Sequence, residues 1–239
     1  MIELSETDLD DLATGTWIMG CGGGGNPYHG YLCAKKLYRE GKRIRLIDPA
    51  QLADDALVAC VNQMGAPLPG EERLSDPRTI CKAVRLMEEY LGARFTAVMP
   101  WEIGGGNGFQ PLFVAAGFDL PLVDADAMGR AFPEVQMVSM HVAGLHPDLI
   151  VLCDVVGNLV SIRATSGEWE TMTIPTFFMV RCSQKFGSPR RRRRRSARLS
   201  VRPDPCARLS ARRGRRPGRV SPSSKWCLRP LRARAGKRR

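Results

Sequence analysis

Residues 95–124, FTAVMPWEIGGGNGFQPLFVAAGFDLPLVD, show the alternation that decides the fold. An apolar strand is expected over Phe95 to Met99, and it leads into the glycine turn Gly104–Gly108. An apolar helix is expected over Gln110 to Ala116, followed by a second strand over Leu120 to Val123. Strand, glycine turn, helix and strand form the unit that builds parallel sheets. We therefore predict an α/β fold, a three-layer parallel-type sheet with helices on both faces.

The N-terminal part is predicted to follow the same order. Ser5 before Glu6 and Asp8 indicates a helix start, and we expect that helix to end near Gly15. The remaining elements are a strand over Thr16 to Met19, a glycine turn over Gly20 to Gly25, a helix from Tyr28 to Glu40 and a strand over Arg43 to Ile47. Asn26 and Pro27 stand where an N-cap and a first helical residue belong.

The remaining pattern divides the chain into three predicted regions. Further elements are a short strand over Leu57 to Val61, a helix over Pro77 to Leu91, and strands over Val138 to Val142, Leu149 to Cys153 and Leu159 to Arg163. We predict an α/β glycine-loop domain over 1–137, the start of a truncated β-rich domain over 138–180, and a disordered Arg-rich tail over 181–239.

Charge is distributed unevenly along the chain. Residues 1–180 carry 13 Lys+Arg and 23 Asp+Glu, a net of 13 − 23 = −10, whereas residues 181–239 carry 23 Lys+Arg and one acid, a net of 23 − 1 = +22. The whole chain is therefore not a basic nucleic-acid binder. The tail itself, with six consecutive arginines over Arg190–Arg195, is interpreted either as the product of a reading-frame shift or as a segment that binds nucleic acid nonspecifically through phosphates.

Localisation is predicted from what the sequence lacks. It has no apolar run long enough for a transmembrane helix, so no membrane association is expected. The acidic N-terminus is unlike a secretory signal or transit peptide. Eight cysteines occur without a C-x-x-C pair or a zinc-like spacing. We expect a cytoplasmic protein, and the sequence defines neither a cofactor nor a metal.

Two glycine-rich stretches resemble each other: GGGNPY at 23–28 and GGGNGF at 104–109. Each is predicted to follow a strand and to precede a helix, which places both at the carboxyl ends of strands, where open α/β sheets bind ligands. The turn over 20–25 also satisfies G-x-G-x-x-G, and Asp48 follows at the end of the next predicted strand. A site for an anionic or carbonyl oxygen, a dinucleotide site, and a tight turn without a ligand all remain open.

Charged residues gather after the strand that ends at Val123. Asp124, Asp126, Arg130 and Glu134 lie within eleven residues. Two close carboxylates raise one pKa, which suits acid–base chemistry or metal binding, and the arginine could clamp a substrate oxygen. Glu102, just before the second glycine turn, is a candidate general base. A helix cap with a surface salt bridge is the simpler interpretation of the acidic cluster.

These stretches resemble a known family. GCGGGGNPYHG, MGAPLPGEERL, EIGGGNGFQPLFVAA and LPLVDADAMGRAFPEVQM are similar to the S-methyl thiohydantoin desulfurase-like family, formerly a domain of unknown function associated with hydantoin and oxoprolinase metabolism. The resemblance covers about residues 5–180 and implies an α/β N-terminal domain followed by a β-rich domain. The tail departs from the family.

The resemblance implies a hydrolase-like enzyme that removes a methylthio group from a small cyclic amide; truncation could leave this copy inactive. The catalytic candidates are Asp124, Asp126, Glu102 and Arg130. The candidate substrate-binding residues are Gly22, Gly23, Gly24, Gly25, Asn26, Gly104, Gly105, Asn107 and Glu134. Nonspecific nucleic-acid binding by the tail and a dinucleotide-binding oxidoreductase are the alternatives, and a homo-oligomer is a possible assembly.

Overall fold

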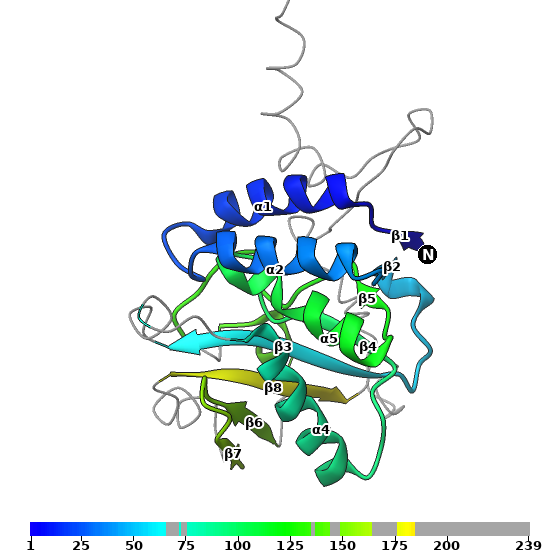
Figure 1. Ribbon diagram of the computed structural model, residues 1–239. Coiled ribbons are helices and arrows are strands. Elements are labelled where there is room, and N and C mark those ends of the chain that lie inside the picture. The colour runs from blue at the N-terminus through cyan, green and yellow to red at the C-terminus, as the bar shows by residue number, and fades with distance from the viewer. Residues whose placement is uncertain (66–71, 73–75, 135–136, 144–148, 164–175, 185–239) are drawn as a thin grey trace, which may run out of the picture.

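A computed structural model describes residues 1–65, 72, 76–134, 137–143, 149–163 and 176–184. Among these residues, eight strands form one mixed sheet in the order β1-β2-β5-β4-β3-β8-β6-β7 (Figure 1). Their bounds are β1 (Ile2–Glu3), β2 (Arg45–Ile47), β3 (Leu57–Gly65), β4 (Ala97–Pro100), β5 (Leu122–Val123), β6 (Ile150–Cys153), β7 (Leu159–Ile162) and β8 (Thr176–Gln184). The predicted α/β class is confirmed.

The centre of the sheet is parallel and its two sides are antiparallel. Strands β2, β5, β4 and β3 run parallel to one another. β1 adds to β2 in the antiparallel direction, as does β8 to β3, β6 to β8 and β7 to β6. The carboxyl ends of the four parallel strands therefore meet at one edge of the sheet, where predicted site residues such as Glu102 and Asp124 begin their loops.

The longer helices cover one face of the sheet. They are α1 (Glu6–Gly20), α2 (Pro27–Arg39), α4 (Ile80–Leu91) and α5 (Gln110–Phe118), and Figure 1 shows α1 and α2 side by side on this face. Their buried residues join one apolar cluster that includes Leu9, Ala34, Val84 and Leu112. The other face has a smaller cluster around Met99 and Trp101, covered by the chain after β5 and by the short helix α6 (Ser139–Val142).

The predicted strand over Thr16 to Met19 is wrong, because α1 continues to Gly20. A capping box at Ser5 begins the helix, and its buried residues Leu9, Leu12, Thr16 and Gly20 follow helical spacing. The helix ends where Cys21 takes a left-handed backbone conformation with φ 49°. The first glycine turn therefore follows a helix, and the strand that a dinucleotide-binding turn requires does not precede it.

The later elements agree with the sequence in part. The hairpin of β6 and β7 is confirmed, with Gly157 at φ 97° in its turn. The strand predicted over Val138 to Val142 is wrong, since Ser139–Val142 is helical and its Met140 packs under the sheet. β8 pairs with β3, so the residues predicted to begin a separate β-rich domain extend the same sheet. The division into domains stays a prediction.

The predicted Arg-rich tail falls mostly outside the described residues. Residues 181–184 of the predicted tail belong to β8, and residues 185–239 lie outside the part of the chain that the structure describes. In the described part, no helix has both the length and the apolar character that crossing a membrane requires.

Candidate functional site

The two glycine turns pack directly against each other. We call Gly20–Gly25 loop 1 and Gly104–Gly108 loop 2. The Gly106 N–H donates to the Gly24 carbonyl oxygen at 2.8 Å. A Cβ on Gly105 would lie 2.5 Å from the Gly24 carbonyl carbon, and a Cβ on Gly24 would overlap the Gly104 carbonyl group. Only glycine allows this backbone contact, so the structure brings the two predicted loops together.

The two loops differ in exposure. Loop 2 is buried throughout, whereas Gly22, Gly23 and Gly25 of loop 1 are exposed. Gly22, Gly24 and Gly25 have φ angles of 89°, 73° and 76°, and their N–H groups donate to no residue that the structure describes. Loop 1 then leads to Asn26, an exposed residue whose side chain caps α2 by accepting the Tyr28 N–H at 2.8 Å. Loop 1 can therefore contact a ligand, and the buried loop 2 packs against loop 1.

The acidic stretch after β5 packs onto both loops. The Ala131 N–H donates to the Met19 carbonyl oxygen at 3.0 Å, at the end of α1. Ala131 also lies within contact distance of the positions where Gly23 and Gly104 would carry a Cβ. The predicted convergence of the glycine loops with the segment that carries Asp126 and Arg130 is therefore present.

Asp126 holds this arrangement in place. Its carboxylate, 6% exposed, accepts the Ile103 N–H and the Gly129 N–H at 2.8 Å each, and the Met128 N–H at 3.2 Å. A carboxylate that accepts several backbone N–H groups organises the loop around it. The geometry thus gives Asp126 a positioning contact to Ile103, the residue directly before loop 2, whereas a catalytic role for Asp126 stays a prediction.

Glu102 lies in a buried hydrogen-bond network. Its side chain is 3% exposed; Oε1 accepts the Asn107 amide at 2.5 Å and Oε2 accepts the Phe132 N–H at 2.9 Å. Asn107 Oδ1 in turn accepts the Gln63 N–H at 2.6 Å, which connects loop 2 to the end of β3. Asn107, predicted to bind substrate, is buried here and ties Glu102 to the sheet.

Burial raises the pKa of Glu102 to about 7. The hydrogen bonds from Asn107 and Phe132 lower this pKa, Asp126 raises it, and Arg130 lowers it, but loss of hydration outweighs these effects. A carboxyl group that is partly protonated at neutral pH can both take up and release a proton. Glu102 is therefore a catalytic candidate whose environment matches acid–base chemistry.

The other predicted residues lie around this network. Arg130 is exposed, and its Nη1 donates to the Ala131 carbonyl oxygen at 2.8 Å. Asp124 is partly buried at the end of β5, where its N–H donates to the Ile47 carbonyl oxygen at 2.8 Å. Glu134 is partly buried. Asp48 accepts the Ala50 N–H and caps a 3-10 turn over Pro49–Gln51, so its side chain stabilises this turn.

Sequence reasoning missed two contributors to the site. Gln63 and Phe132 take part through their backbone N–H groups, and a backbone donor leaves no signature in residue type. Only the pairing of loop 2 with β3 and the return of the chain after Gly129 place them beside Asn107 and Glu102. Across the described ranges, no group of three or more His, Cys, Asp or Glu side chains is arranged to hold a metal ion.

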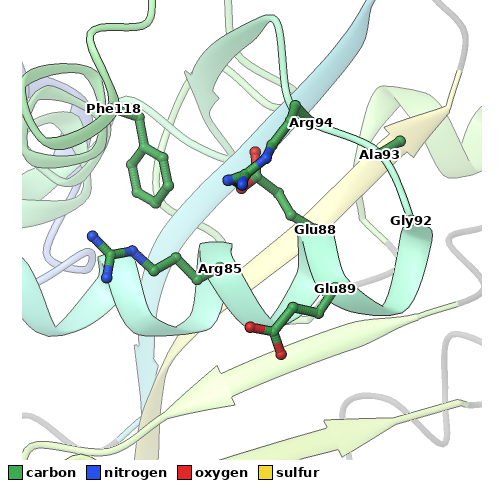
Figure 2. A pocket seen from close by; sticks show the side chains of 7 residues that line it. All are labelled: Arg85, Glu88, Glu89, Gly92, Ala93, Arg94 and Phe118. Atoms are coloured by element: carbon green, nitrogen blue, oxygen red, sulfur yellow. Dashed lines mark hydrogen bonds and ion pairs between the residues drawn. The ribbon is translucent and has the colours of Figure 1, made fainter.

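A separate hollow of about 540 Å³ lies at the end of α4. Its lining residues are Arg85, Glu88, Glu89, Gly92, Ala93, Arg94 and Phe118, none of which was predicted to belong to the site. Figure 2 shows Arg85 extending toward the Phe118 ring and Glu88 paired with Arg94, while Glu89 points away. Its charged groups are either paired or directed to solvent.

The fold and the site together define the class of protein. It is an α/β protein with two glycine loops packed against each other, a buried glutamate and an acidic stretch that packs on both loops. The chain belongs to the family described as S-Me-THD-like, N-terminal domain, which matches residues 7–164. No curated protein matches the chain.

A crystal structure of a protein from Chromobacterium violaceum has a similar fold. The TM-score is 0.62 at 24% sequence identity, and the match covers 76% of this chain and 54% of that one. This chain therefore spans about half the length of that protein. At this level of identity the similarity establishes the fold alone.

Proposed function

We propose that this site acts in the hydrolytic removal of a methylthio group from a small cyclic amide of the S-methyl thiohydantoin type. Water adds to the ring carbon of the C=N bond, the bond from that carbon to sulfur breaks, and methanethiol leaves while the ring keeps a carbonyl oxygen. The reaction needs a group that removes a proton from water and returns one to the departing thiolate. It also needs donors for the negative charge that develops on the ring.

Glu102 is the proposed proton carrier, and the observation that carries the proposal is its burial with two neutral hydrogen-bond donors, which raises its pKa to about 7. Its ionised form can accept a proton from water and its neutral form can protonate the thiolate, so one residue can serve both steps near pH 7. Because Glu102 is 3% exposed, its carboxyl group has to become accessible before it can exchange a proton with a ligand. Asn107 and Asp126 position it.

Loop 1 and Arg130 are the proposed ligand contacts. Gly22 and Gly25 are exposed residues, and their N–H groups can donate to a ring oxygen or nitrogen, as backbone amides do in oxyanion sites. The exposed guanidinium of Arg130 follows Gly129, whose N–H is held by Asp126, so it is anchored at the same place. Asp124, Asn26 and Glu134 remain candidates for further contacts with the ligand.

The test is turnover of S-methyl thiohydantoin by the chain, followed as methanethiol released into the headspace. Glu102→Gln is expected to lower turnover by about 10²-fold or more, the usual contribution of a general acid–base group. Glu88→Gln is the matched control, because Glu88 is also buried and also accepts one backbone and one side-chain donor. Equal activity of the Glu102 variant and wild type, or no methanethiol from wild type, would overturn the proposal.

A further inference from the structure

The outward face of α1 and α2 has an apolar end beside loop 1. The core-facing residues of α1, Leu9, Leu12, Thr16 and Gly20, are buried, and the opposite stripe faces outward. At the loop end this stripe carries Trp17, which is 57% exposed, and Ile18, which is 49% exposed. On α2, Tyr28 is 59% exposed and Leu32 is 46% exposed. Exposed large apolar side chains that gather in one place mark an interaction surface.

The far end of the same face is charged, with opposite signs on the two helices. The first turns of α1 carry the exposed acids Glu6, Asp10 and Asp11, and the last turns of α2 carry the exposed bases Lys36 and Arg39. Tyr31 and Lys35 of α2 both bind the Asp10 carboxylate, at 2.6 and 2.9 Å, which shows that the first half of α1 lies beside the middle of α2 and that the two helices run in opposite directions. Acids and bases therefore lie side by side at this end.

We propose that this face binds a second copy of the chain, with a two-fold axis that runs parallel to the helices between the two copies. That rotation places α1 of one protomer over α2 of its partner and keeps the loop ends together. Trp17 and Ile18 then meet the partner's Tyr28 and the partner's Leu32, and the acids of α1 meet the bases of the partner's α2. Two helix pairs packed in this way form a four-helix layer.

The charge pattern is the reason to assign a second copy to this face. An isologous interface requires a surface that complements itself after a two-fold rotation, and acid on one helix beside base on the other meets that requirement. A partner of one charge sign would be attracted by one helix and repelled by the other. In the described part of the chain, Asp11 and Arg39 make no ion pair, and Lys36 reaches only Glu40 at 3.8 Å.

Molar mass in solution tests the assembly. Light scattering after size exclusion is expected to give twice the chain mass of 26.4 kDa. Trp17→Glu is expected to raise the dissociation constant at least about tenfold, because a charge replaces a large aromatic contact. Leu159→Glu on β7 is the control, since Leu159 is also apolar and is 42% exposed but lies outside this face. A monomeric wild type, or a Trp17→Glu dimer as tight as wild type, would overturn the proposal.

Mixing two variants tests the geometry. In an Asp11→Lys dimer and in a Lys36→Glu dimer, like charges face each other, so each variant alone is expected to dissociate more readily than wild type. A mixture restores opposite charges across both halves of the interface, so a heterodimer with near-wild-type affinity is expected. Circular dichroism of each variant establishes that it is folded. Failure of the mixture to recover would show that the charges act within one chain and would overturn this arrangement.

Discussion

Glu102 and Glu88 are two buried glutamates with the same number of hydrogen bonds but different partners. Glu88, 6% exposed, accepts the Arg94 guanidinium and the Phe95 N–H, both at 2.9 Å. Glu102, 3% exposed, accepts the Asn107 amide at 2.5 Å and the Phe132 N–H at 2.9 Å. One side-chain donor is therefore a cation at the surface, and the other is neutral and buried.

This difference shows what sets a buried carboxylate apart for chemistry. The Arg94 guanidinium compensates the negative charge of Glu88 directly, and this ion pair stabilises the end of α4. The two neutral donors of Glu102 do not outweigh the loss of hydration, and its pKa rises to about 7. Burial without a paired cation is thus the feature that makes Glu102 a candidate for proton transfer at neutral pH.

The largest effect is expected from the glycines beside the two glutamates. Gly105→Ala should lower the free energy of unfolding by about 3–5 kcal/mol, because a Cβ at φ 61° would lie 2.5 Å from the backbone of loop 1. Gly92→Ala has nearly the same φ, 60°, but nothing within 4 Å, so about 1–2 kcal/mol is expected. Urea unfolding of both variants measures the difference, and equal losses would contradict the close contact of the two loops.

Removal of the side-chain donor should affect the two glutamates unequally. Asn107→Leu leaves Glu102 with one donor and leaves the Gln63 N–H unsatisfied, so a loss of about 2–4 kcal/mol is expected. The pKa of Glu102 should rise further, because the Asn107 hydrogen bond lowers it. Arg94→Met removes a side chain that is 83% exposed, so water can replace part of its hydrogen bond to Glu88, and a smaller loss of about 1–2 kcal/mol is expected. Chemical denaturation at pH 7 ranks the two, and a larger loss from Arg94→Met would reverse the comparison.

The stability of the chain should depend on pH through Glu102. Its folded pKa of about 7 lies above the ordinary value of 4.5, so its neutral form is favoured in the folded state. This contribution is fully present below pH 4.5 and is lost as pH rises through about 7, by roughly 3 kcal/mol in all. Asp10, Asp76 and Asp154 have lowered pKa values and act at more acidic pH.

Thermal unfolding between pH 5 and pH 8 measures this dependence. The melting temperature of wild type should fall across that range, and Glu102→Gln should flatten the fall. Glu88→Gln is the matched control for the removal of a buried carboxylate. A slope that persists in Glu102→Gln would contradict the assignment of this pH dependence to Glu102.

The smallest effect is expected from Arg130. Its positive charge lowers the pKa of Glu102, but less than the other causes, so Arg130→Leu should raise that pKa slightly. Because Arg130 is exposed, the free energy of unfolding should change by less than about 0.5 kcal/mol. The same variant should weaken binding of an S-methyl thiohydantoin if Arg130 contacts it. A large loss of stability would show that Arg130 supports the fold instead.

The sequence predicted those parts of the structure that local patterns determine. The helices over 27–39 and 80–91 and the strands of the parallel centre follow from apolar spacing and from glycine or proline at their ends. The residues around Trp17 were misassigned, because β-prone side chains there lie on the exposed side of a helix whose buried stripe continues past them. Tertiary packing of that stripe outweighed local propensity.

The sequence predicted which segments form the site, but it did not predict what each residue does there. Glycine runs and the acidic stretch correctly indicated which segments meet, since close backbone approach requires glycine. The sequence could not show that loop 2 is buried under loop 1, or that the Asp126 carboxylate is occupied by three backbone N–H groups. These facts depend on where the backbone of distant segments lies.

Direct titration of the Glu102 carboxyl group tests the central claim. Carbon NMR of the glutamate side chains, with Glu102→Gln to assign the signal, reports its protonation as a function of pH. A midpoint near 7 is expected, because burial outweighs two neutral hydrogen-bond donors. A midpoint near 4.5, the value of an ordinary glutamate, would contradict the assignment of Glu102 as the proton carrier.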